Sequence, residues 1–402
     1  MDDRLDVVIV GAGPAGAVAA LLLARGGFNV ALLDRMHFPR PKACAEYLSP
    51  GVMEEMCRLG LESDFRQLNP HPVGGMRIVS PGGQYLDVRY ETGNGSTPAY
   101  TLSRLQLDNM LVIEARRAGA MVLEKFCVRD FEWSHGRVVG VQGTHDGKQE
   151  TLRSRLTILA DGSRSGLARK LHLARNVRWP VRMGLVAHYG SDRQWPGDLG
   201  VMHVAHDGYC GVAPMGNRRL NVAVVVPVER FRSAGMPAPA FLEHWIESRP
   251  ELEHSLSSWT RVTPVRGYSP VGSRVSKAWA PGVLLVGDAA GFFDPFTGEG
   301  VFRALRSAKL ATDVARDALR SDDLSDHRLA HYAALRAHEF RSKQRVSSLV
   351  QLFVQYPGLM NYALPRLRKR RKPSQILANV LGEIESPDTF LAPRVLWSAL
   401  RP

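Results

Sequence analysis

Hydrophobic positions near the start of the chain predict a strand, a helix and a second strand in immediate succession. Residues 6–10 form an apolar run of the length expected for a buried strand, and residues 17–25 have the composition of a helix. Gly26 and Gly27 end this helix, and residues 29–33 make the second strand, which closes on Asp34. This pattern predicts a β-α-β unit, the building block of doubly wound α/β domains.

The remaining chain divides into segments of two kinds. Helix and strand alternate again after residue 103 and after residue 276, whereas short, glycine-punctuated stretches of sheet lie between these segments. Strands are expected at 121–128, 131–141, 151–160 and 283–286, and a long helix at 300–319. We therefore predict an α/β fold with three parts: a Rossmann-like domain (1–70, 103–177 and 276–320), a mostly antiparallel β-sheet substrate domain interleaved with it (71–102 and 178–275), and a helical C-terminal region (321–402).

Composition narrows the class of protein without changing this fold. The hydrophobic share of 45% and the charged share of 23% are ordinary for a globular protein. No apolar run reaches the roughly 18 residues of a membrane span, and the first strand leaves no room for a signal peptide, so we expect a cytoplasmic protein. The four cysteines lack zinc-type spacing, which favours a reducing compartment and no metal site. A net charge of +13 favours anionic partners, but no nucleic-acid-binding module is recognisable, so no nucleic acid is expected as a partner.

The first turn of the β-α-β unit has the spacing of a dinucleotide-binding loop. Gly11 permits a tight turn, Gly13 lets backbone N–H groups approach a pyrophosphate, and Gly16 lets the helix pack closely on the strand. The helix N-terminus directs its free N–H groups and its positive dipole end at the phosphates. Asp34 stands where a carboxylate accepts the hydroxyls of an adenosine ribose. We place the cofactor in this loop, including Pro14 and Ala15.

Two further strands end in an acid followed by glycine. Asp161 and Gly162 follow the strand at 151–160, and Gly287 and Asp288 follow the strand at 283–286. Acids at the carboxyl ends of strands face the ligand crevice of an open α/β sheet. The loop after Asp34 also passes close to the cofactor. We therefore add a set of basic and glycine-rich candidates to the cofactor site: Arg35, Lys42, Arg104, Val128, Pro295, Gly298, Gly300 and Val301.

Together these motifs resemble the fingerprints of FAD-dependent enzymes of the aromatic-hydroxylase type, the group A flavoprotein monooxygenase superfamily. The resemblance implies that the cofactor is FAD, with Asp34 at the adenosine ribose, Arg104 on the pyrophosphate side and Asp288 at the ribityl chain. It places residues 298–301 at the flavin's pyrimidine edge, where a helix N-terminus stabilises the charge of reduced flavin. It also implies a transient electron donor, either NAD(P)H or a partner reductase.

Within this superfamily, residues 287–300, the hairpin at 208–216 and residues 382–394 look like the geranylgeranyl reductase-like branch. The branch often has a lysine, a cysteine and glycines after the second strand; this chain keeps Lys42 and Cys44 but lacks the glycines. Cys44 and Glu46 are the candidates for proton handling near the flavin. The alternatives are a small buried apolar residue for Cys44 and a salt bridge of the loop for Glu46.

Three functions remain open from the sequence. The first is a reductase or dehydrogenase that transfers hydride to or from a C=C bond of a hydrophobic or carrier-linked substrate. The second is a monooxygenase that hydroxylates an aromatic or polyketide-like substrate through a flavin C4a-hydroperoxide. The third is a non-catalytic flavin-binding interaction protein. Halogenation is not expected, because no two tryptophans stand two residues apart as in the halogenase motif.

One basic run near the end of the chain lies outside the predicted cofactor site. Six of the seven residues from Arg366 to Lys372 are lysine or arginine, and an apolar stretch at 349–364 precedes them. We expect this run either to be a solvated helix end or to contact an anionic membrane surface or an acidic carrier protein.

Overall fold

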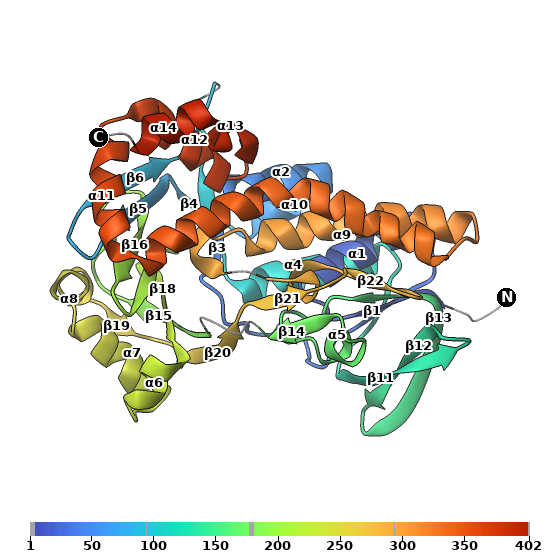
Figure 1. Ribbon diagram of the computed structural model, residues 1–402. Helices are drawn as coiled ribbons and strands as arrows, with labels where there is room; N and C mark the ends of the chain where they lie inside the picture. The colour runs from blue at the N-terminus through green and yellow to red at the C-terminus, as the bar shows by residue number, and fades with distance from the viewer. Residues whose placement is uncertain (1–4, 94, 177–180, 293, 401–402) are drawn as a thin grey trace.

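The computed structural model describes residues 5–93, 95–176, 181–292 and 294–400. Asn94, residues 177–180 and Phe293, which fall within predicted sheet or glycine-rich segments, lie outside the described residues. The two sheets lie beside each other, α10 (Asp326–Gln355) runs across both, and the helices after it gather at one end (Figure 1). The predicted α/β class with a helical C-terminal region is confirmed.

The first sheet is built around the predicted N-terminal unit. Strand β1 (Leu5–Val10) pairs in parallel with β2 (Val30–Leu33) on one side and with β13 (Lys148–Leu159) on the other. The parallel part continues through β10 (Met121–Leu123) at one edge and β23 (Val283–Leu285) at the other, where β22 (Trp279–Ala280) pairs antiparallel. Helices α1 (Pro14–Arg25), α4 (Arg104–Arg117) and α9 (Gly300–Arg320) pack together beside it.

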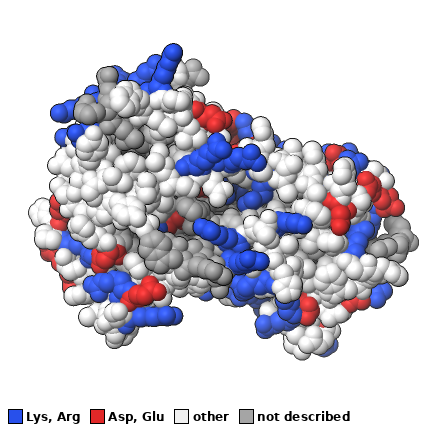
Figure 2. Space-filling model, viewed as in Figure 1, with Lys and Arg blue, Asp and Glu red and all other residues white. Residues whose placement is uncertain are grey.

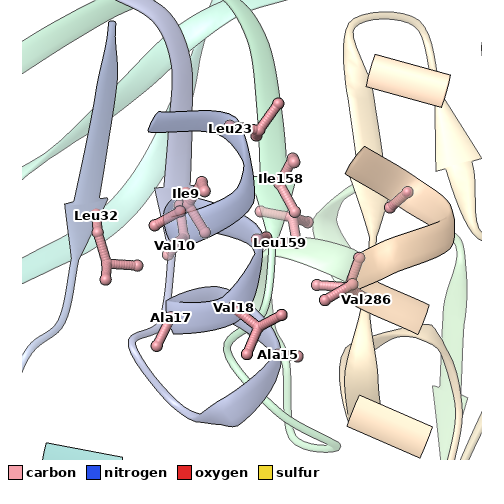
Figure 3. Close-up of a cluster of buried hydrophobic side chains, with 14 of the residues drawn as sticks. Ile9, Val10, Ala15, Ala17, Val18, Leu23, Leu32, Ile158, Leu159 and Val286 are labelled. Atoms are coloured by element: carbon pink, nitrogen blue, oxygen red, sulfur yellow. The ribbon is translucent and has the colours of Figure 1, made fainter. Parts of the chain in front are cut away.

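The core of this domain consists of small and branched side chains between α1 and the central strands. Ile9 and Val10 of β1, Leu32 of β2 and Ile158 of β13 belong to the same cluster of buried hydrophobic side chains as Val18 of α1 (Figure 3). Alanines predominate on the buried face of α1, which lets the helix approach the sheet closely. This packing fixes the position of the helix N-terminus relative to the strand ends.

An antiparallel extension continues the sheet through β12 (Arg137–His145) and β11 (Phe126–Ser134). The predictions of single strands at 121–128 and 131–141 are therefore wrong. The chain breaks at Glu124–Lys125 and turns again at His135–Gly136, where both residues have positive φ angles of 47° and 74°. Because apolar residues continue on both sides of this two-residue turn, hydrophobicity alone conceals it.

The second sheet is mostly antiparallel. Its strands run in the order β19 (Thr260–Arg261), β15 (Arg182–Gly190), β18 (Arg219–Pro227), β17 (Gly208–Pro214), β16 (Leu199–Ala205), β5 (Gly75–Val79) and β6 (Tyr85–Arg89), with β20 (Arg266–Val271) also paired to β15. Residues 215–218 join β17 to β18 as a hairpin. Helices α6 (Val228–Ser233), α7 (Ala238–Glu247) and α8 (Pro250–Leu256) follow; α7 and α8 cover one face of this sheet.

The C-terminal helices cover part of the other face. They are α10 (Asp326–Gln355), α11 (Pro357–Arg368), α12 (Arg371–Leu381), α13 (Pro387–Leu391) and α14 (Pro393–Leu400). Their apolar residues share one hydrophobic cluster with strands β5, β6, β16, β17 and β18. Three short helices complete the chain: α2 (Pro50–Arg58), α3 (Glu62–Gln67) and α5 (Gly166–Lys170). One small sheet consists of β3 (Tyr47–Leu48), β9 (Ala99–Thr101) and β4 (His71–Val73). Two further pairs are β7 (Glu91–Thr92) with β8 (Gly95–Ser96), and β14 (Ala174–Asn176) with β21 (Ser273–Val275).

Candidate FAD site and active site

The turn between β1 and α1 has the geometry of an anion cradle. Gly11 has a φ of 101°, and a Cβ at Gly16 would lie 1.8 Å from the Gly11 carbonyl oxygen, so neither position admits a side chain. A Cβ at Gly13 would meet only the Arg40 guanidinium, at 3.8 Å. The space in front of Gly13 is therefore available to a ligand, next to the N-terminus of α1 that starts at Pro14.

Asp34 stands directly beside this turn. Its Oδ2 accepts hydrogen bonds from the Ala12 N–H (2.9 Å) and from Arg40 Nη2 (3.1 Å), and its Oδ1 accepts from the Met36 N–H. The carboxylate is thus fixed at the end of β2, where the ribose contact is expected. Of two further predicted residues, Arg35 follows Asp34 directly and is exposed, and Val128 is half-buried on β11.

Arg104 is held rigidly at the start of α4. Its guanidinium donates to both carboxylate oxygens of Asp108 at 2.7 and 2.8 Å, and Ser103 caps the helix through the Gln106 N–H. Burial alone would lower the pKa of Arg104, but the Asp108 carboxylate raises it above its usual range. The Arg104 charge is therefore permanent and positioned before any ligand binds.

The second glycine-rich segment meets the first at Gly287. A Cβ there would lie 2.8 Å from the Ala15 Cβ, so the absence of a side chain lets the two loops approach each other. Gly287 opens a short 3₁₀ turn, residues 287–290, that carries Asp288. Burial raises the pKa of Asp288, while Lys42, Arg104 and Arg303 oppose that rise. Asp288 is thus a carboxylate surrounded by cations.

Tyr268 belongs to this cluster, although sequence patterns did not indicate it. Its ring lies 4.9 Å from Lys42 Nζ and 4.3 Å from the Arg164 guanidinium carbon, and its hydroxyl shares a hydrogen bond with Ser163. Burial, followed by the charge of Arg104, lowers the pKa of Lys42. Tyr268 comes from the second sheet, so only the tertiary fold brings it to Asp288.

Glu46 joins the predicted catalytic loop to the second sheet. Its Oε1 accepts from the Arg104 N–H at 2.9 Å, while its Oε2 lies 2.7 Å from His188 Nε2 and accepts from Asn221 Nδ2 at 3.1 Å. Its φ of 57° is a strained, left-handed conformation that these bonds maintain. They give the buried Glu46 a structural role as a link between domains, and its role in proton handling stays a prediction.

Cys44 lies two residues earlier in the same loop. It is half-buried, its Sγ accepts from the Glu46 N–H at 3.3 Å, and its thiol lies beside the Arg104 guanidinium. A thiol next to a fixed cation is in a polar setting, unlike the small buried apolar residue of the alternative interpretation.

The turn before α9 is tied to both the second sheet and the C-terminal helices. Asp294 accepts from Arg182 Nη1 (2.5 Å), from the Tyr209 hydroxyl (2.6 Å) and from the Phe296 N–H (3.0 Å). A Cβ at Gly298 would lie 3.0 Å from the Tyr47 ring. The predicted residues Pro295, Gly298, Gly300 and Val301 are therefore held in place at the start of α9, with Val301 buried in the core.

The remaining predicted pair follows β13. Asp161 is exposed and Gly162 is half-buried, and the turn ends where Ser165 caps α5 by accepting from the Ala168 N–H at 2.9 Å. Asp161 thus lies at the carboxyl end of the strand next to β1, on the same edge of the sheet as Asp34.

These groups fit FAD as a set. The α1 N-terminus, Arg104 and Lys42 offer donors and positive charge to a pyrophosphate, and Asp34 and Asp288 offer acceptors to its sugar and ribityl hydroxyls.

Comparison with known proteins agrees with this chemistry. A family model described as an FAD binding domain matches residues 4–337. Among relatives, digeranylgeranylglycerophospholipid reductase 1 of Methanococcoides burtonii is 33% identical over 339 residues, covering 83% of this chain and 79% of that protein. Digeranylgeranylglycerophospholipid reductase 1 of Methanopyrus kandleri is 34% identical over 349 residues, covering 84% of this chain and 87% of that protein.

Solved structures share the whole architecture. A geranylgeranyl bacteriochlorophyll reductase-like protein of Thermoplasma acidophilum has a TM-score of 0.79 at 25% identity, over 98% of this chain and 96% of that one. A flavoprotein/dehydrogenase of Cytophaga hutchinsonii has a TM-score of 0.83 at 20% identity, and the flavin-dependent brominase Bmp2 has a TM-score of 0.81 at 20% identity. Each match covers 98% of this chain and 99% of the other chain, which shows the same fold.

Fold and site define an FAD-dependent oxidoreductase of the aromatic-hydroxylase superfamily. Within that superfamily, the chain belongs to the geranylgeranyl reductase-like branch.

Proposed function

We propose that this oxidoreductase is a reductase that saturates a C=C bond of a hydrophobic substrate, such as a prenyl chain or a carrier-linked polyene. The names of the relatives, which are lipid reductases, support this substrate class. The observation that carries the proposal is the small, apolar surface that the second sheet turns toward the FAD domain.

This surface follows from strand register. His188 and Asn221 contact the Glu46 loop, so the face of β15 and β18 that carries them is turned toward the FAD domain. Alternate residues of a strand share a face, so Ala223 lies on the same face as Asn221, and Gly184 lies on the same face as His188. Gly211 of β17 pairs with Ala223 and therefore lies on this face too. These three residues are only half-buried although they lie on central strands.

The side chains on this face leave room for a ligand. A Cβ at Gly211 would meet only Met202, at 3.4 Å, and a Cβ at Gly184 would have its first contact at 3.8 Å. Hydrogen atoms and methyl groups at these positions offer hydrocarbon contact without hydrogen-bonding groups. A substrate that is an extended hydrocarbon matches such a surface, because its burial removes apolar area from water on both partners.

Bound FAD, once reduced, supplies the hydride for one carbon of the double bond. In this proposal the chain supplies the proton for the other carbon from the loop of Cys44 and Glu46, and excludes water by covering the site with the second sheet. Cys44 lies beside the buried Arg104 guanidinium, and Glu46 accepts a hydrogen bond from the Arg104 N–H, so one fixed residue positions both candidate proton donors. NAD(P)H or a partner reductase is proposed as the electron donor.

Anaerobic flavin reoxidation tests this proposal. The purified protein is reduced, mixed with a geranylgeranyl lipid, and followed by the return of oxidised-flavin absorbance and by mass spectrometry of the lipid. We expect reoxidation coupled to a gain of two hydrogens in the lipid. The competing monooxygenase function predicts no anaerobic reoxidation by the lipid, and oxygen incorporation into an aromatic compound when air is admitted.

A variant of the apolar surface makes the test specific. Gly211→Phe places a ring on the proposed substrate face and should slow reoxidation by the lipid at least about tenfold, the rate equivalent of ~1.4 kcal/mol. Reoxidation by ferricyanide, a small soluble acceptor that does not need this surface, serves as the control and should be unchanged. Equal slowing of both reactions would contradict the assigned substrate surface.

A further inference from the structure

The C-terminal helices expose cations and aromatic side chains together at one end of the molecule. We call this set the basic–aromatic surface: Leu359, Tyr362, Arg366 and Lys369 of α11 and the residue after it, Arg371 and Lys372 of α12, and Arg394 and Trp397 of α14. Helices α11, α12 and α14 pack against one another, so the helices that carry these residues are neighbours. Figure 2 shows Lys and Arg side chains gathered at the end where Figure 1 draws α12 and α14.

The apolar members of this surface are unusually exposed for large side chains. Trp397 is 69% exposed, and Leu359 and Tyr362 are each 41% exposed. Helix α11 buries its other face normally through Met360 and Leu364. Exposure of this kind is therefore confined to one side of the helix, which indicates a contact surface.

The cations of this surface have few acidic counterparts. No aspartate or glutamate occurs between Glu339 and Glu383 in the sequence. Arg371 lies 3.8 Å from Glu91, but Lys369, Lys372 and Arg394 make no ion pair or side-chain hydrogen bond with any described residue. Their positive charge is thus available to an external anion.

Spacing places the two kinds of side chain on the same side of α11. Leu359, Tyr362, Arg366 and Lys369 follow at intervals of three and four residues, which is one face of a helix. The Arg366 guanidinium carbon lies 3.4 Å above the Tyr362 ring. On α14, Arg394 and Trp397 are likewise three residues apart. Mixed faces of this kind, with aromatic side chains beside lysine and arginine, suit the headgroup region of a membrane.

We propose that the basic–aromatic surface binds an anionic lipid bilayer, with the cations at the phosphate groups and Trp397, Tyr362 and Leu359 in the headgroup–acyl boundary. Among the described residues, no helix is long and apolar enough to cross a membrane, so the contact is peripheral. The inference goes beyond the proposed reaction and would hold for any substrate. Its geometric consequence is that the membrane lies against helices whose buried faces share a hydrophobic cluster with Phe296 of the turn before α9.

Vesicle flotation tests the proposal on the full-length, FAD-loaded protein. We expect the protein to float with vesicles of equal parts phosphatidylglycerol and phosphatidylcholine, but not with phosphatidylcholine alone, and to be released by high salt. The triple variant Lys369→Ser/Lys372→Ser/Arg394→Ser should bind about a hundredfold more weakly, at roughly fivefold per basic residue. A matched control removes three exposed cations elsewhere, by Arg129→Ser, Lys148→Ser and Arg320→Ser, and should lose much less binding.

Trp397 gives a second readout that does not depend on charge. Its fluorescence, obtained as the difference between the wild-type protein and Trp397→Phe, should shift to shorter wavelength when anionic vesicles are added. Flavin content and far-UV circular dichroism establish that each variant is folded. Failure to float at low salt, or equal loss of binding in the triple variant and its control, would overturn the proposal. Binding to an acidic acyl-carrier protein in place of vesicles would reassign this surface to a protein partner. None of these outcomes depends on the reaction catalysed.

Discussion

At the scale of single residues, two glycines of the same loop serve different purposes. Gly16 has no room for a side chain because the Gly11 carbonyl is in contact with it, whereas Gly13 borders open space in front of α1. The fold therefore requires Gly16, and we predict that the ligand requires Gly13. Substitution by alanine separates these two requirements.

We predict that Gly13→Ala leaves the stability of the FAD-free protein nearly unchanged, because its Cβ has no contact closer than 3.8 Å. The same variant should bind FAD at least about tenfold more weakly, since the new methyl group occupies the path to the pyrophosphate. Gly16→Ala should instead lower the free energy of unfolding by several kcal/mol, on the order of other severe backbone clashes. Urea denaturation and flavin fluorescence titration measure both quantities. A Gly13→Ala protein with unchanged FAD affinity would contradict the assigned position of the pyrophosphate.

At the scale of elements, α10 connects the C-terminal region to the turn before α9 through a buried lysine. Lys343 Nζ lies 3.2 Å from Glu383 Oε1 and 3.8 Å from Glu299 Oε2, and it donates to the Val380 carbonyl at 2.5 Å. Burial raises the pKa of Glu383, and Lys343 opposes that rise. Glu299 is the residue that precedes α9. Lys343 of α10 thus joins the turn before α9 to the loop after α12.

We predict that Lys343→Met lowers the free energy of unfolding by about 3–5 kcal/mol, because it leaves the buried Glu383 carboxylate without a cation and Glu299 with Arg303 alone. The double variant Lys343→Met/Glu383→Gln should regain part of this loss, since it also removes the unpaired charge of Glu383. Lys309→Met is the matched control. Lys309 pairs with Asp313 at the surface, with both side chains 42% exposed, so its removal should cost less than ~1 kcal/mol. Equal effects of the two lysine substitutions would show that Lys343 has no special structural role.

At the scale of the whole molecule, the candidate FAD site is assembled from segments that are far apart in the chain. The β1–α1 turn, the loop of Lys42, the start of α4, Tyr268 of the second sheet and the turn before α9 all contribute. Arg182 extends this assembly, because its guanidinium donates to Asp294 and also to Gln351 of α10. Ligand binding at such a junction stabilises both sheets and the C-terminal helices together.

We predict that FAD at a hundred times its Kd raises the free energy of unfolding by about 2.7 kcal/mol, as linkage requires for a ligand that binds only the native state. The shift should appear in one cooperative transition, seen equally by tryptophan fluorescence and by far-UV circular dichroism. Riboflavin, which lacks the phosphates and the adenosine, is the control and should give a smaller shift at the same concentration. A separate early transition of the C-terminal helices, insensitive to FAD, would contradict the coupling described above.

The sequence by itself determined the parts of this protein that depend on local patterns. Apolar runs and glycine spacing predicted the β-α-β unit and the long helix after Gly300, because these features depend on neighbouring residues. Motif resemblance added FAD and the reductase-like branch, both of which the comparisons confirm. The strand boundaries around His135 were wrong because hydrophobicity does not reveal a two-residue turn.

Only the tertiary structure decided which side chains meet. Tyr268 between Lys42 and Arg164, the Glu46–His188 link and the Lys343 network each join residues far apart in the chain. The exposure of Trp397 beside the basic run was equally invisible in the sequence, because it depends on how α11, α12 and α14 pack. Periodicity reports which face of an element is apolar. It does not report the partner of that face, and in this protein those partners complete the site and create the basic–aromatic surface.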